Sequence, residues 1–169
     1  TVNRESIFVR LSIDLHNLTN FFSLLKECQG LIFLTGVGKS GLVAEKIAVT
    51  LTSTGSKAFY ISPTNALHGD IGMVSSKDIF IIISKSGESP EIKVLLPLIR
   101  NFGNTLIAMV GNLESNLARQ SDIILNTTVS QEACPNNLAP TSSTTAQLVM
   151  GDALAVVLME VKGFNSDDF

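Results

Sequence analysis

The chain has 169 residues, of which 45% are hydrophobic and 16% are charged. This length suggests a single domain, and the composition is that of a globular protein rather than a disordered one. The formal net charge of −3 and the lack of a basic stripe argue against a nucleic-acid partner. Two cysteines, Cys28 and Cys134, are too few for a disulfide framework, so we expect a reduced, cytoplasmic setting.

Strands and helices are expected to alternate along the chain. The predicted strands are short apolar runs, typical of strands covered on both faces. They occupy residues 31–35, 57–61, 78–84, 105–111 and 122–127. The predicted helices, with apolar residues at spacings of three and four, occupy residues 3–28, 39–55, 88–103, 114–120 and 146–161. The alternation predicts an α/β fold, a parallel sheet with helices on both faces.

The last predicted helix is the most apolar segment of the chain. Residues 146–161 are interrupted by Asp152 and Glu160 and are too short to span a bilayer. We therefore expect a helix buried on most of its faces, no membrane partner and, since no basic flank precedes an apolar stretch, no signal peptide. The chain begins with Thr1 and stops at "SDDF", so we expect a fragment that supplies one domain, residues 1–169.

The first predicted strand runs into a glycine-rich turn, "GVGKSG". A nucleoside-triphosphate loop requires a glycine five residues before the Gly-Lys pair, where this chain has Phe33. Gly36, Gly38 and Gly41 fit a dinucleotide fingerprint, but the acid that it requires after the second strand is missing. A tight turn shaped by glycine explains the glycines but not Lys39. The turn alone therefore leaves its ligand open.

A second polar loop, "SKSGES", follows the third predicted strand and opens a helix. Ser84, Ser86 and Ser89 offer three hydroxyl groups, and Gly87 lets the backbone come close to a ligand. A helix N-terminus presents free N–H groups and a partial positive charge, which suits a phosphate monoester. Serine also caps helices that bind nothing, but three serines at the carboxyl end of a parallel strand favour a ligand site.

These motifs, together with "STT" opening a late helix, resemble the sugar isomerase (SIS) domain. The stretches "GVGKSG", "STGSKAFY", "HGDIGM", "SGESPE", "EACPNNLAPTSSTTAQL" and "GDALAVVLMEVKGF" resemble the arabinose-5-phosphate isomerases, from about residue 30 to 169. The resemblance implies a three-layer sandwich with a five-stranded parallel sheet in flavodoxin-like order, and usually a homotetramer. It also implies a bacterial cytoplasmic enzyme that interconverts D-ribulose 5-phosphate and D-arabinose 5-phosphate, the precursor of Kdo in lipopolysaccharide or capsule.

Such an isomerase moves a proton between adjacent carbons, which requires a base, an acid and a group that stabilises a developing oxyanion. The resemblance implies four catalytic residues: Lys39, His68, Glu91 and Glu132. We expect Glu132 to be the base, because burial can raise the pKa of a loop carboxylate. Lys39 is expected to stabilise the oxyanion, and His68 to open the ring or shuttle a proton. Glu91 is expected to orient Lys39 or to act as a second acid.

The expected substrate-binding residues come from the two loops and are Gly38, Ser40, Ser84, Lys85, Ser86 and Ser89. Lys85 departs from the family, in which we expect a small amide; the added cation either strengthens phosphate binding or points to solvent. No cofactor is expected, and no metal, because the two histidines and Cys134 lack the spacing of a zinc site. The family carries a further catalytic histidine beyond "DDF" and then a pair of regulatory (CBS) modules. We therefore expect this chain to bind pentose phosphate but to turn it over poorly.

Each catalytic candidate also has a purely structural interpretation. The helix dipole alone favours Glu91 in a first turn, His68 before Gly-Asp fits a turn residue equally well, and a loop acid such as Glu132 is usually solvated. Lys39 begins a helix, the unfavourable end for a cation, so a structural role is less expected. A phosphosugar or nucleotide-sugar sensor without turnover is the alternative function. A dinucleotide-dependent oxidoreductase is disfavoured by the missing acid.

Overall fold

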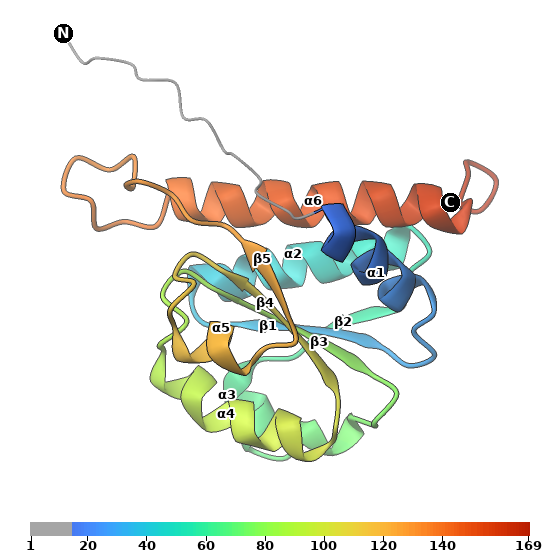
Figure 1. Cartoon of the computed structure of the whole chain (residues 1–169), viewed down its shortest axis with the longest axis horizontal. Helices are drawn as coiled ribbons and strands as arrows, with labels where there is room; N and C mark the ends of the chain where they lie inside the picture. The colour runs from blue at the N-terminus through green and yellow to red at the C-terminus, as the bar shows by residue number, and fades with distance from the viewer. Residues whose placement is uncertain (1–14) are drawn as a thin grey trace, which may run out of the picture.

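The computed structural model describes residues 15–169, with side chains from residue 21 onward, and shows one parallel sheet between two layers of helices (Figure 1). The first fourteen residues, which include the start of the predicted helix 3–28, lie outside the described part. The strands are β1 (Ile32–Gly36), β2 (Ala58–Tyr60), β3 (Ile79–Ser84), β4 (Thr105–Val110) and β5 (Ile123–Asn126). Their order in the sheet is β2-β1-β3-β4-β5, which is the flavodoxin-like order implied by the resemblance.

The helices divide between the two faces of the sheet. In chain order they are α1 (Leu15–Lys26), α2 (Lys39–Ser53), α3 (Pro63–Leu67), η1 (Asp70–Met73), α4 (Pro90–Asn101), α5 (Asn116–Gln120) and α6 (Ser142–Lys162). Side chains of α1, α2 and α6 form one apolar core with the sheet, and side chains of α3, α4 and α5 form the other. Figure 1 shows α6 lying across α1 and α2 as the outermost element of its face.

Strand β3 illustrates why these apolar runs form a central sheet. Ile79, Ile81 and Ile83 belong to the core under α2 and α6, whereas Phe80 and Ile82 belong to the core over α4. Successive side chains of a strand point to opposite faces. Because both faces are covered, every residue of β3 is buried, as the lack of polar alternation predicts.

Helix α6 differs from the prediction in both length and burial. It has 21 residues, and by length and composition alone it could cross a membrane. The expectation that this segment is too short for a span is therefore wrong, although core helices of soluble proteins pass the same test. Within one chain, α6 buries Met150 and Leu158 but exposes Val149 and Val156, so it is not buried on most faces.

Two short helices lie where the sequence predicts only a loop. Helix α3 and the 3-10 turn η1 follow β2, and Pro63 provides the first residue of α3. A proline at this position loses no helical hydrogen bond. The elements are only five and four residues long, too short to show a 3.6-residue apolar period. They place His68 at the C-cap of α3, beyond the carboxyl end of β2.

Candidate functional site

Three polar loops meet at the carboxyl edge of the sheet. They join β1 to α2, β3 to α4 and β5 to α6, and each leads directly into a helix N-terminus. Carboxyl ends of parallel strands share one edge, which is where α/β sheets bind ligands. The first backbone N–H groups of each helix have no intrahelical partner, so this edge is suited to an anion.

The glycine turn after β1 is shaped by close backbone packing. A Cβ atom added at Gly41 would lie 2.6 Å from the carbonyl oxygen of Gly36, so α2 can approach the end of β1 only if position 41 is glycine. Gly38 has φ +58°, a conformation that favours glycine. Backbone shape thus accounts for these glycines. Lys39 begins α2 as predicted and is exposed.

Ser40, the residue after Lys39, connects α2 to α6. Its hydroxyl donates to Oε1 of Gln147 at 3.1 Å. Gln147 is buried, and its Nε2 has no partner among the described residues. Gln147 carries no signal of its own in the sequence, although it lies in the "STTAQL" stretch of the family motif.

The serine loop, residues 84–89, is held by its own hydroxyl groups. Ser84 is buried, and its Oγ accepts the N–H of Gly87 at 2.9 Å. Ser86 Oγ accepts the N–H of Glu88 at 3.2 Å. Both serines use their oxygen as an acceptor here, so each O–H can still donate to a phosphate oxygen. Ser89 is the N-cap residue of α4, but its side chain makes no capping hydrogen bond.

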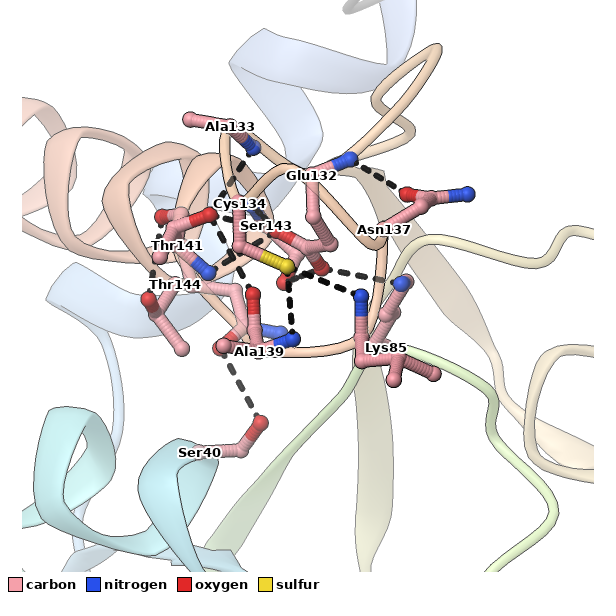
Figure 2. A network of polar contacts seen from close by, with 12 residues as sticks. Ser40, Lys85, Glu132, Ala133, Cys134, Asn137, Ala139, Thr141, Ser143 and Thr144 are labelled. Atoms are coloured by element: carbon pink, nitrogen blue, oxygen red, sulfur yellow. Dashed lines mark hydrogen bonds and ion pairs between the residues drawn. The ribbon is translucent and has the colours of Figure 1, made fainter.

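Glu132 is the most densely hydrogen-bonded acid of the site (Figure 2). Its carboxylate accepts hydrogen bonds from Ser143 Oγ at 2.5 Å and N at 3.1 Å, and from Thr141 N at 2.8 Å and Oγ1 at 3.2 Å. The ammonium of Lys85 lies 2.8 Å from Oε1. Glu132 is buried, so these donors replace water around its negative charge.

The pKa of Glu132 does not shift in the direction expected from the sequence. Burial raises the pKa, but the side-chain hydrogen bonds from Lys85 and Ser143 and the backbone hydrogen bonds from Thr141 and Ser143 together lower it to about 2. The donors favour the charged form more strongly than burial disfavours it. The expectation that burial tunes this carboxylate upward is therefore wrong for this structure, in which Glu132 is ionised at neutral pH.

The loop from Glu132 to Thr141 is folded around these contacts. Glu132 N donates to Asn137 Oδ1 at 2.7 Å, and the N–H groups of Leu138 and Ala139 donate to the sulfur of Cys134 at 2.9 Å and 3.1 Å. These backbone hydrogen bonds lower the pKa of the Cys134 thiol. Among the residues that the structure describes, no three His, Cys, Asp or Glu side chains gather as a metal site.

Glu132 contacts a predicted substrate-binding residue, Lys85, rather than the other predicted catalytic residues. Within residues 21–169, no hydrogen bond or ion pair joins Lys39, His68 or Glu91 to Glu132 or to each other. His68 is exposed, and Glu91 lies in the first turn of α4, where the helix dipole alone favours it. The catalytic roles of these three residues stay predictions.

Comparison with known proteins shows to which family the chain belongs. A family model described as "SIS domain" matches residues 25–157. The chain belongs to the SIS domain family. This SIS domain is 52% identical over 165 residues to "Arabinose 5-phosphate isomerase KdsD" of Pseudomonas aeruginosa, which covers 98% of this chain and 50% of that protein. It is 45% identical over 157 residues to "Arabinose 5-phosphate isomerase KpsF" of Escherichia coli O6:H1, with coverages of 93% and 48%. The chain thus spans about half the length of these curated relatives.

A solved structure with the same fold is named as a complex with a sugar phosphate. It is the E. coli CFT073 protein c3406 in complex with arabinose 5-phosphate, and it matches this SIS domain with a TM-score of 0.88 and 42% sequence identity. The match covers 93% of this chain and 84% of that chain. The five-stranded parallel SIS fold expected from the sequence is confirmed.

Proposed function

We propose that this SIS domain is the catalytic domain of an aldose–ketose isomerase that interconverts D-ribulose 5-phosphate and D-arabinose 5-phosphate. The observation that carries the proposal is the 52% identity, over 98% of the chain, to a protein named as that isomerase. The serine loop and the buried acid at one edge of the sheet are consistent with it. In this proposal the enzyme works in the cytoplasm as a homo-oligomer, a tetramer, and its product supplies Kdo synthesis.

The serine loop is proposed to hold the phosphate. The hydroxyl groups of Ser84, Ser86 and Ser89 donate to its oxygens, and the N-terminus of α4 stabilises its charge. Fixing one end of an open-chain sugar restricts the positions that its first two carbons can take relative to the loop. This restriction lowers the entropic cost of the proton transfer.

In the proposed reaction, a base removes a proton from carbon 2 of the aldose and returns it to carbon 1. A second proton moves from the oxygen of carbon 2 to that of carbon 1, through an enediol. Glu132 is proposed as the base, Lys39 as the stabiliser of the enediolate charge, and His68 and Glu91 as the groups that move protons on oxygen. With a pKa of about 2, Glu132 is a poor base until its ion pair with Lys85 is altered.

That ion pair favours one alternative function. A domain that binds the sugar phosphate without turnover needs the serine loop but no base, and an acid held ionised by Lys85 fits a structural role. The sensor is therefore the second candidate.

Conversion of D-ribulose 5-phosphate separates the two candidates. The full-length protein is incubated with this ketose, and the pentose phosphates are resolved by chromatography. Arabinose 5-phosphate should form with the wild type, and Glu132→Gln should lower the rate by about 10² to 10⁴ while affinity stays within a few-fold. The variant, purified in parallel, also controls for a contaminating isomerase. Binding of arabinose 5-phosphate without any conversion would make the protein a sensor, and a near-normal rate in the variant would exclude Glu132 as the base.

A further inference from the structure

Lys85 links the serine loop, which is proposed to bind the phosphate, to the carboxylate of Glu132. It lies in the serine loop between Ser84 and Ser86, and its side chain reaches across to Glu132 (Figure 2). The side chain of Lys85 is 48% exposed, whereas that of Glu132 is 0% exposed. The ammonium of Lys85 is therefore accessible to solvent, whereas the carboxylate that it contacts is not.

The backbone of the serine loop is fixed independently of this ion pair. The N–H of Gly111 donates to the carbonyl oxygens of Lys85 at 3.1 Å and Ser84 at 3.3 Å. The N–H of Leu117 donates to the carbonyl oxygen of Gly87 at 3.3 Å. Lysine has a flexible four-carbon stem, so its ammonium can change partner by side-chain rotation alone. Such a change leaves the loop backbone in place.

Glu132 can lose Lys85 without becoming an unpaired buried charge. The N–H and hydroxyl groups of Thr141 and Ser143 supply four other donors to its carboxylate. These hydrogen bonds continue to stabilise the negative charge of Glu132, which lowers the cost of losing its ionic partner. The titratable groups that interact with Glu132 among the described residues are Lys85 from the serine loop and Cys134 from its own loop. Helix α6 contributes hydroxyl and amide groups.

We propose that Lys85 is a positioning residue shared by two anions: it pairs with Glu132 when the serine loop is empty and with the sugar phosphate when the loop is filled. The proposal rests on the phosphate site assigned under the proposed function. Its consequence is that substrate binding removes the cation from Glu132. Loss of a nearby positive charge raises the proton affinity of a carboxylate, so the base becomes effective only when substrate is present.

The sign of one mutational effect tests this competition. Calorimetric titrations with inorganic phosphate and with arabinose 5-phosphate compare the full-length wild type, Glu132→Gln, Lys85→Met and the double variant. Glu132→Gln should tighten binding by about threefold, because Lys85 no longer has to leave a carboxylate. In the Lys85→Met background the same change should alter affinity by less than about twofold. Lys85→Met alone should weaken binding about tenfold, and Lys85→Arg should restore most of it.

Lys46→Met is the matched control. Lys46 is a lysine of similar exposure, 46%, that pairs with Asp152 between α2 and α6. Its removal lowers the net charge equally but should leave phosphate affinity within about twofold. Weaker or unchanged binding in Glu132→Gln would overturn the shared-cation proposal. If Glu132→Gln tightens phosphate binding equally in the Lys85→Met background, the proposal is also overturned. The loss of a negative charge near the site would then explain the tighter binding without Lys85.

A second measurement keeps Glu132 intact, in case its substitution disturbs the loop. Sulfate does not titrate near pH 5, so calorimetry in buffers of different ionisation enthalpy reports proton uptake by the protein. Sulfate binding should take up a fraction of a proton in the wild type and clearly less in Lys85→Met. Equal uptake would overturn the proposal. If neither phosphate, sulfate nor arabinose 5-phosphate binds the wild type, both the proposed phosphate site and the role of Lys85 are wrong. If these anions bind but show neither the Lys85-dependent effect of Glu132→Gln nor the Lys85-dependent proton uptake, only the proposal that Lys85 is shared is wrong.

Discussion

The hydroxyl and the backbone amide of Ser143 both donate to the carboxylate of Glu132, at 2.5 Å and 3.1 Å. A loop acid therefore satisfies N–H groups at the start of α6, the role that an N-cap side chain usually has. The N-cap residue itself, Thr141, makes no side-chain capping bond. Glu132 is thus a structural element of the domain as well as the proposed base, and its substitution should affect both stability and turnover.

The stability contributed by Glu132 should depend on pH in a defined window. Its pKa in the folded chain is about 2, below the ordinary 4.5, so the contribution is fully present above pH 4.5 and is lost as the pH falls toward 2. Urea unfolding of the wild type and Glu132→Gln should differ by at most about 3 kcal/mol at neutral pH. More than half of the pH-dependent part of this difference in the free energy of unfolding should be lost near pH 3. A difference that stays constant with pH would contradict the ionised, hydrogen-bonded state.

Removing two hydroxyl groups of the serine loop should weaken sugar-phosphate binding strongly. In Ser84→Ala combined with Ser86→Ala, each lost hydrogen bond to a charged group should cost about 1.5 to 3 kcal/mol. Calorimetric titration with arabinose 5-phosphate measures the change. Ser53→Ala, which removes an exposed hydroxyl from the far end of α2, is the control and should bind normally. Unchanged affinity in the double variant would place the phosphate elsewhere.

The exposed apolar face of α6 should mediate oligomer formation. The exposed valines on this helix are Val149, Val156, Val157 and Val161. Val156→Asp, at a position 60% exposed in one chain, should raise the dissociation constant of the oligomer by about tenfold or more. Val94→Asp, at a 58% exposed valine on α4, is the control and should leave assembly intact. Sedimentation at micromolar concentration measures both; a monomeric wild type would contradict the expected tetramer.

Cys134 should react faster with an alkylating reagent than Cys28, the other free cysteine of the described residues. The N–H groups of Ala139 and Leu138 hydrogen bond to its sulfur and lower the pKa of the thiol, so more thiolate is present near neutral pH. Mass spectrometry after timed exposure to iodoacetamide at about pH 7 measures the two rates. The same rate at both cysteines would show that the loop does not hold this conformation in solution.

Local sequence patterns predicted most of the fold. The starts of α2 at Lys39 and α4 at Pro90 were predictable because a glycine turn and a helix-starting proline mark them. The apolar pattern alone starts the last helix at residue 146, because Ser142 to Thr145 are all polar and show no apolar period, whereas the "STT" motif of the resemblance indicates the earlier start. Glu132, ten positions before Ser142 in the chain, accepts the N–H groups of Thr141 and Ser143 and so stabilises the first turn of α6.

The site was harder to predict than the fold. The sequence indicated Lys85 and Glu132 separately, since each lies in a recognisable loop, but not that they touch. Lys85 follows β3 and Glu132 follows β5, so their contact depends on the order of the strands in the sheet, which no local pattern records. The pKa of Glu132 was misjudged for the same reason: burial could be expected from the sequence, whereas the donors on Thr141, Ser143 and Lys85 could not.

The position of α6 in the chain has a consequence for synthesis on the ribosome. This helix covers Phe21 of α1 and Ile47 of α2, yet it is translated after all five strands. Gly151 packs so closely on Ile47 that a side chain there would collide with it. A nascent chain that ends at β5 therefore displays an apolar layer to chaperones and to neighbouring polysomes. We expect docking of α6 to be the step that ends this exposure and commits the domain to its native form.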